Sequence, residues 1–110
     1  MENINFEDFE KLDIKIGTIK SVEKVEDADR LFVFKVDVGE ENERTIISGV
    51  AEYFFEPEVL FGRQVPVLMN LKPRKIRGIE SQGMILYASD EDGLTILEPG
   101  RKMKSGSAIK

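Results

Sequence analysis

The chain has 110 residues, of which 41% are hydrophobic and 34% are charged, and its formal net charge is −5 at pH 7. A chain of this length has room for one domain and one hydrophobic core, and the composition is that of an ordinary soluble globular protein. Without cysteine or histidine it lacks the usual zinc ligands and the commonest nucleophile and base. No window approaches the roughly 18 apolar residues of a membrane span, and the acidic residues 1–8 do not resemble a secretory signal. We therefore expect one cytoplasmic domain over residues 1–110, with no metal, cofactor or membrane contact.

The N-terminal half carries the pattern of a short helix followed by three strands. Apolar residues at a spacing of three predict a helix over residues 6–12. Residues 14–24 predict a strand whose apolar face changes sides at Gly17, which indicates a bulge or a sharp bend. Strict alternation over residues 31–38 is typical of a half-buried strand. A third strand is expected at residues 45–48, after an acidic turn.

The C-terminal half adds a short helix and more strands. Pro57 and Gly62 stand where a short helix would begin and end. Strands are expected at 64–71, 84–88 and 94–97. A long bent first strand, with a helix between the third and fourth strands, is the plan of a five-stranded OB-fold barrel. An SH3-like barrel or a small sandwich would have a similar number of strands, and the position of the helix favours the all-β OB barrel.

The basic residues are concentrated in one segment. Residues 63–77 hold five basic residues and no acidic one, whereas residues 1–62 hold seven basic and 16 acidic residues. A local positive patch can meet phosphates even when the whole chain is acidic. The acidic remainder would suppress indiscriminate binding to nucleic acid, so the pattern favours a shaped target.

Four of these cations lie within six residues, on a loop that we expect between two strands. Pro73 stiffens its start and Gly78 frees its end. Long basic side chains can reach phosphates, and arginines can also stack on bases. The cations are Lys72, Arg74, Lys75 and Arg77, and neutral hydrogen-bonding groups follow at Asn70, Ser81 and Gln82. The alternative interpretation is an ordinary solvated loop.

Short motifs along nearly the whole chain decide between these interpretations. Together they are highly specific, although each is weak alone. The most distinctive are Asn-Leu-Lys-Pro at 70–73, Lys-Ile-Arg-Gly at 75–78 and Glu-Ser-Gln-Gly-Met at 80–84, preceded by matching stretches at 9–17, 28–31, 35–39, 48–50 and 62–63. In this order they resemble the tRNA-binding domain shared by methionyl-tRNA synthetase C-terminal extensions, their separate beta subunits and free-standing tRNA-binding proteins.

The resemblance implies an OB fold with extra C-terminal strands, a homodimer when free-standing, and recognition of tRNA by its shape rather than its anticodon. It also implies a non-catalytic module, with a methionyl-tRNA synthetase chain supplying the catalysis; DNA is not an expected partner. Arg74 departs from the small residue expected there and adds a cation. The family's motif positions put RNA contacts at Lys35, Ser48, Asn70, Lys72, Lys75, Arg77, Ser81, Gln82 and Met84.

Several of these residues also have structural interpretations. Met84 opens an apolar strand and could belong to the core, Ser81 could only tie the loop, and Lys35 could simply keep a strand edge polar. Residues 53–55 (Tyr-Phe-Phe) could form a base-stacking platform, although a barrel plug or an interface is the preferred interpretation beside a short helix. The glycines at 49, 78 and 83 could serve backbone conformation alone.

Two further expectations concern function and assembly. The dimeric chaperone CsaA shares the fold and much of the N-terminal sequence. It lacks the Glu-Ser-Gln-Gly-Met motif at 80–84, so tRNA binding is the preferred function. A second copy of the chain would bury apolar side chains near the C-terminus, namely Leu94, Ile96, Leu97, Met103 and Ile109. The initial methionine and the family-like ending at 107–110 favour a complete small protein or subunit.

Overall fold

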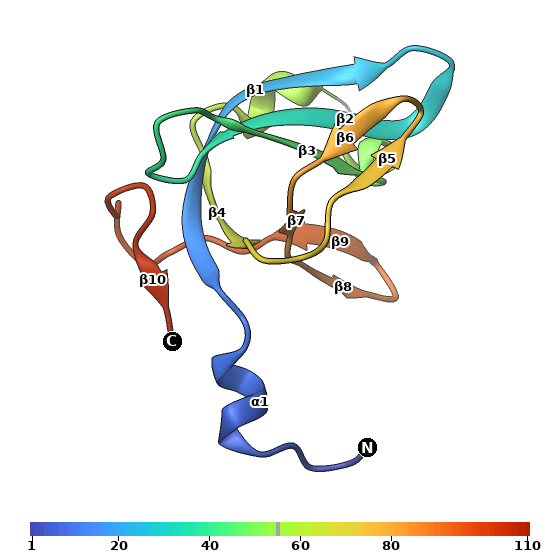
Figure 1. Cartoon of the computed structure of the whole chain (residues 1–110). Coiled ribbons are helices and arrows are strands. Elements are labelled where there is room, and N and C mark those ends of the chain that lie inside the picture. Colours follow the sequence, from blue (N-terminus) through green and yellow to red (C-terminus); the bar gives the residue numbers. More distant parts are fainter. Residues whose placement is uncertain (55) are drawn as a thin grey trace.

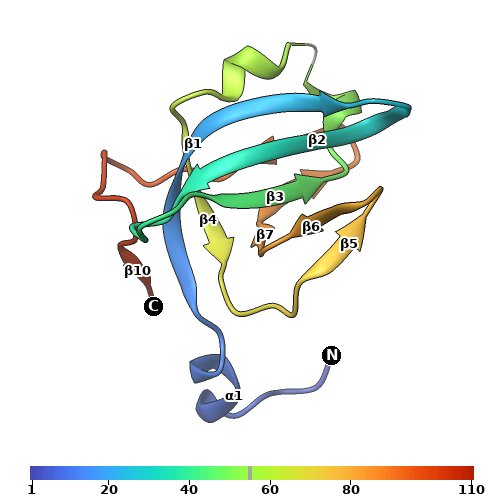
Figure 2. The same cartoon turned by 45° about the horizontal axis from the view of Figure 1, so that its top comes forward.

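The first strand, β1 (Ile14–Val25), is long enough to take part in both sides of a barrel. In the computed structural model, which describes residues 1–54 and 56–110, the start of β1 pairs with β4 (Gln64–Leu68) and its end pairs with β2 (Ala28–Asp37). The change of partner falls at Thr18, which is in register with Gln64 on one side and Asp37 on the other. Figures 1 and 2 show β1 curving from one side of the barrel to the other.

Gly17 lies on the inner side of the curve of β1, where the side chains of β2 and β4 leave no room for a Cβ atom. A Cβ atom at Gly17 would lie 2.5 Å from Val36 Cγ1 and 2.9 Å from Val67 Cγ2. Neighbouring side chains therefore approach the backbone of Gly17 closely, which is one reason for a glycine inside a strand, and β1 changes partner at the next residue. The nearest irregularity in pairing with β2 lies further along the chain, between Ile19 and Ser21.

The core lies inside the barrel, and β2 contributes most to it. Phe32, Phe34 and Val36 are fully buried, as their alternation predicts, and the two rings meet edge to face with centroids 6.0 Å apart. Leu60, in the short 3₁₀ helix η2 (Pro57–Leu60), is also fully buried in this core. Of the aromatic run at residues 53–55, Phe54 packs against the core, Tyr53 is exposed, and Phe55 lies outside the described residues.

The barrel is closed by contacts between β3 (Arg44–Ser48) and the chain that precedes β7 (Met84–Ile85). The sheet order is β3-β2-β1-β4-β7. The Gln82 backbone N–H donates to the Thr45 carbonyl at 2.8 Å, and the Thr45 N–H donates to Gln82 Oε1 at 2.9 Å. These bonds join the two ends of the sheet order, so the architecture is the barrel-like, mostly β fold that the sequence predicts.

The chain after β7 adds short strands, as the family resemblance implies. β8 (Tyr87–Asp90) and β9 (Gly93–Ile96) form a hairpin, and β10 (Ala108–Ile109) pairs with the start of β1. Within the residues that the structure describes, the rest of the chain forms two small helices and one more hairpin. These elements are α1 (Phe6–Glu10), η1 (Ala51–Tyr53), β5 (Arg74–Ile76) and β6 (Ile79–Ser81). Within residues 1–54 and 56–110, none of the helices has the length and apolar character needed to cross a membrane.

Arg44 fastens the barrel where β3 begins. Its Nη1 donates to the carbonyls of Met69, at 2.7 Å, and Gln82, at 3.0 Å, and its other nitrogens form a two-pronged ion pair with Glu40. Hydrogen bonds from Arg44 lower the pKa of the Glu40 carboxyl. One guanidinium therefore links three segments that are distant in the sequence.

We expect Arg44→Leu to lower the free energy of unfolding by about 2 kcal/mol, because two partly buried carbonyls lose their donor. Glu40→Gln is the matched control, since it keeps the carbonyl bonds, and should cost less than about 1 kcal/mol. Urea denaturation of both variants measures the difference. Equal losses would mean that the exposed ion pair, and not the carbonyl bonds, carries the effect.

Candidate nucleic-acid interface

The basic segment is an ordered β-hairpin rather than the loop that we expected. β5 and β6 are antiparallel, with Arg74 opposite Ser81 and Ile76 opposite Ile79. Arg77 and Gly78 form the two-residue turn, and both have positive φ, at 52° and 80°. Positive φ at both central residues is the mark of the type I′ turn that matches the twist of a hairpin. A hairpin fixes the spacing of its side chains more firmly than a loop would.

The four cations of this segment are exposed and are available to a ligand. Lys75 stands opposite Glu80 in the register, but in the described part of the chain none of the four forms an ion pair. By contrast, Arg44 and Arg63 are each paired with a glutamate. The exposed cations are Lys72, Arg74, Lys75 and Arg77. The positive charge that the sequence concentrates here is therefore not neutralised by the fold.

Ser81 and Gln82 hold the hairpin against β3 instead of pointing freely outward. Ser81 is buried, and its Oγ accepts a hydrogen bond from the Ile47 N–H at 3.0 Å. The Gln82 side chain accepts from Thr45, as described above. In the structure, these two predicted contact residues thus position the hairpin, and their best hydrogen-bonding atoms are already engaged.

Lys35 joins the hairpin through Thr45, which sequence analysis did not single out. Lys35 is exposed on β2, and its Nζ donates to Thr45 Oγ1 at 2.6 Å. Thr45 in turn holds Gln82 through its backbone. Alternation along β3 puts Thr45 and Ile47 on the side of the strand that faces the hairpin. We use the name hairpin face for the exposed cations brought together in this way, which are Lys35, Lys72, Arg74, Lys75 and Arg77.

Asn70 and Ser48 are not brought into this group. The Asn70 amide donates to the Lys11 carbonyl at 2.6 Å, and its Oδ1 accepts from the Asp13 N–H at 2.9 Å. It therefore ties the chain after α1 to the end of β4. Ser48 lies on the other side of β3 from Thr45, and its Oγ accepts a hydrogen bond from the Tyr87 hydroxyl at 3.0 Å. Both residues have a structural partner in the fold.

Tyr87 gives a prediction for alkaline pH. Burial raises its pKa to about 12, and the hydrogen bond to Ser48 opposes this shift more weakly. Because the folded pKa is above the ordinary value of about 10, this contribution to stability is complete below pH 10 and is lost as the pH rises from 10 to 12. We expect the free energy of unfolding in urea to fall less steeply over this interval for Tyr87→Phe than for the wild type. Parallel curves would show that Tyr87 does not cause the alkaline loss.

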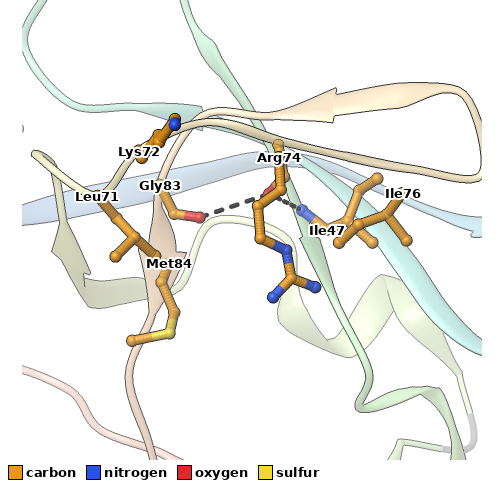
Figure 3. A pocket seen from close by; sticks show the side chains of 8 residues that line it. Ile47, Leu71, Lys72, Arg74, Ile76, Gly83 and Met84 are labelled. Carbon is orange, nitrogen blue, oxygen red and sulfur yellow. Dashed lines mark hydrogen bonds between the residues drawn. The ribbon is translucent and has the colours of Figure 1, made fainter.

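A small pocket lies at the base of the hairpin, and most of its lining is apolar. Leu71 and Met84 stand at its rim, 42% and 41% exposed, while Ile47 and Ile76 lie on the side of β3 and β5 (Figure 3). Met84, which could have been a core residue, therefore opens outward. Leu71 was not predicted as a site residue, although its position between Asn70 and Lys72, two predicted contact residues, indicated it. In residues 1–54 and 56–110, no cluster of carboxylates is arranged to hold a metal ion.

Comparison with known proteins bears directly on the interface. A family model described as "Putative tRNA binding domain" matches residues 14–108 of this chain. The chain belongs to this tRNA-binding domain family. The resemblance identified from the motifs is therefore confirmed, and it covers every strand described above except the last residue of β10.

Relatives of this tRNA-binding domain include methionine–tRNA ligases. The chain is 51% identical over 109 residues to the methionine–tRNA ligase of a Bacteroides fragilis strain. It is 42% identical over 110 residues to the methionine–tRNA ligase of Pyrococcus horikoshii. It covers 98% or more of its own length in these matches, but spans only 16% and 15% of the two ligases.

Two solved structures have the same fold as this tRNA-binding domain over essentially their full length. The methionyl-tRNA synthetase-related protein from Pyrococcus horikoshii superposes with a TM-score of 0.91 at 35% identity, covering all of both chains. The chaperone CsaA from Bacillus anthracis superposes with a TM-score of 0.87 at 25% identity, covering 99% of this chain and 100% of the other.

Proposed function

We propose that this domain binds folded tRNA through the hairpin face. The observation that supports this most strongly is the ordered hairpin with four exposed cations, none of them ion-paired within the described residues, in a chain with a net charge of −5. Lys35 extends the positive surface across β2. Such a surface can neutralise several phosphates, while the acidic remainder of the chain repels other parts of a polyanion.

A rigid hairpin is suited to a ligand with a fixed arrangement of phosphates. Contacts to phosphates position a nucleic acid but carry no base sequence directly. Fixed cations therefore favour the RNA whose phosphates match their spacing, and a folded tRNA offers a fixed spacing that a flexible single strand does not. This accounts for the recognition by shape that the family resemblance implies.

We further propose that the domain is non-catalytic and delivers tRNA, in the cytoplasm, to a methionyl-tRNA synthetase catalytic chain. The supporting observation is that the matching ligases are about six times longer than the matched region, as the coverage of 16% implies. In such an arrangement the domain raises the local concentration of tRNA, and the catalytic chain carries out aminoacylation.

A homodimer belongs to the same proposal. Of the apolar residues expected at such an interface, Leu94 and Ile96 are partly buried against the domain's own core, whereas Leu97 is exposed. A second apolar surface supports dimerisation. Phe6 and Phe9 lie on α1, which projects from the barrel (Figure 1), and Leu12 follows this helix; all three are exposed. A second copy would cover these side chains and add a second hairpin to the same particle. Sedimentation of Phe6→Ser/Phe9→Ser as a monomer, against a wild-type dimer, is the expected result.

The alternative function is that of a chaperone, and the likeness to CsaA is the observation that favours it. A chaperone would use exposed apolar surface to hold an unfolded polypeptide, and α1 offers such surface. The two functions separate in one assay. Suppression of client aggregation by the purified protein without RNA, combined with no preference among RNAs, would favour the chaperone.

Competition binding tests the tRNA proposal. Labelled folded tRNA would be bound by the protein and displaced by unlabelled folded tRNA, the same tRNA kept unfolded, duplex RNA or duplex DNA. We expect folded tRNA to displace the label at the lowest concentration. Equal, weak displacement by all four competitors would mean that the hairpin face attracts any polyanion.

A further inference from the structure

The pocket at the base of the hairpin combines apolar walls with cations at its edge. Leu71 and Met84 leave large parts of their side chains exposed there, so a ligand that covers them removes apolar surface from water. We propose that this pocket receives a single unstacked nucleobase of the bound RNA. This inference rests on the proposed function and adds a specific subsite to it.

The size of the pocket suits one ring system. Figure 3 shows the Arg74 side chain extending between Met84 on one side and Ile47 and Ile76 on the other. The cavity volume is about 130 Å³, well below the roughly 300–1,000 Å³ of sites that enclose a drug-sized ligand. A base can enter this space while its sugar and phosphates remain outside, beside the hairpin.

The chemistry of the lining agrees with a nucleobase. The Met84 thioether is flexible and polarisable and makes favourable contacts with aromatic rings. The Arg74 guanidinium can stack on a base, and Lys72, which also lines the pocket, can pair with a flanking phosphate. An apolar peptide side chain would cover Leu71 and Met84 equally well, but it would supply no anion for these two cations. The nucleobase is therefore the occupant that satisfies the whole lining.

The pocket has little means of telling one base from another. The Ser81 hydroxyl accepts from the Ile47 N–H and lies 3.4 Å from the Gly83 carbonyl oxygen, so it is already engaged. Gly83 has no side chain and adds no hydrogen-bonding side-chain group to the pocket lining. Stacking on apolar and cationic side chains accepts any base, which agrees with recognition by shape.

Methyl NMR tests the inference directly, because the chain has only four methionines, at positions 1, 69, 84 and 103. In protein labelled with ¹³C at the methionine methyls, ring currents from a stacked base should move the Met84 signal upfield when folded tRNA is added. The buried Met69 serves as the internal control. Adenosine 5′-monophosphate at millimolar concentration should shift the same signal, and ribose 5-phosphate, which lacks the base, should not.

Binding of tRNA by variants provides the second readout. Leu71→Ala/Met84→Ala should weaken binding roughly tenfold, as expected for loss of one stacked base, and should leave the salt dependence unchanged because no cation is removed. Leu97→Ala is the matched control, since Leu97 is 43% exposed and does not line the pocket. Circular dichroism and urea denaturation of each variant confirm that it is folded.

The outcomes separate this inference from the proposed function. If tRNA binds and binding depends on the hairpin cations, but neither tRNA nor the mononucleotide moves the Met84 signal, the pocket is not a base site and the tRNA function stands. If an unfolded client polypeptide shifts Met84 and the nucleotides do not, the pocket holds apolar side chains and the base-site inference is wrong. The proposed function fails as well only if folded tRNA also does not bind. If the mononucleotide shifts Met84 but tRNA does not bind, the base site stands and the proposed function fails.

Discussion

Lys75→Ala/Arg77→Ala will weaken the binding of folded tRNA and make the binding less sensitive to salt. If the hairpin face neutralises about four phosphates, the affinity of the wild type should fall about a hundredfold between roughly 50 and 200 mM salt. Without two of these contacts, the loss over the same interval should be only about tenfold. The variant should therefore bind much more weakly than the wild type at low salt, and the two should become more alike at high salt. Fluorescence anisotropy of labelled tRNA across a salt series measures both quantities.

The control for this prediction removes the same charge elsewhere. Lys104→Ala/Lys110→Ala takes two positive charges from exposed positions in the C-terminal segment, which does not contribute to the hairpin face. Its salt dependence should match that of the wild type. If both double variants lose affinity equally and with the same slope, net charge controls binding and the hairpin has no special role.

Gly17→Ala will destabilise the domain by about 3 kcal/mol, a large part of the roughly 5–15 kcal/mol that holds a domain of this kind together. The added methyl would lie 2.5 Å and 2.9 Å from methyl groups of Val36 and Val67, on β2 and β4. Valine side chains have little rotational freedom, so the strands on both sides of the bend must move apart. Urea denaturation gives the free energy of unfolding.

Gly49→Ala is the matched control for the bend. A Cβ at Gly49 would meet only Leu31 Cδ2, at 3.9 Å, which is ordinary van der Waals contact. The substitution also removes backbone freedom from the unfolded chain, so it should be neutral or stabilise by less than about 1 kcal/mol. If Gly17→Ala were as mild as Gly49→Ala, the interior of the bend would be able to relax, and close packing would not explain the glycine.

Long strands with regular alternation could be predicted from the sequence. Phe32, Phe34 and Val36 show a period of two because one face of β2 lies against the core. The bend in β1 was also predictable, since the change of apolar face falls at Gly17. By contrast, β5, β6 and β10 have three, three and two residues, too few to show a period. In the sequence, only Arg77-Gly78 indicated a hairpin turn, and the high charge of the surrounding segment favoured a loop instead.

The candidate site was predicted in its charges but not in its contacts. A charged side chain in water needs no partner within the protein, so the sequence alone predicts that Lys72 and Lys75 are exposed. Hydrogen bonds of polar side chains depend on residues far along the chain, as between Asn70 and Lys11 or between Ser81 and Ile47. Such pairs exist only after folding. Met84 differs for another reason, because alternation leaves open which of two neighbours faces inward, and here Ile85 is the buried one.

The most direct test of the central claim is amide NMR of the ¹⁵N-labelled domain during titration with folded tRNA. If tRNA binds at the hairpin face, the largest shifts will fall on residues 72–83 and on Lys35 and Thr45 across β2 and β3. The amides of α1 and β10 will move little in comparison. Shifts concentrated on α1, with the hairpin unchanged, would contradict the account and place the binding surface on the apolar helix.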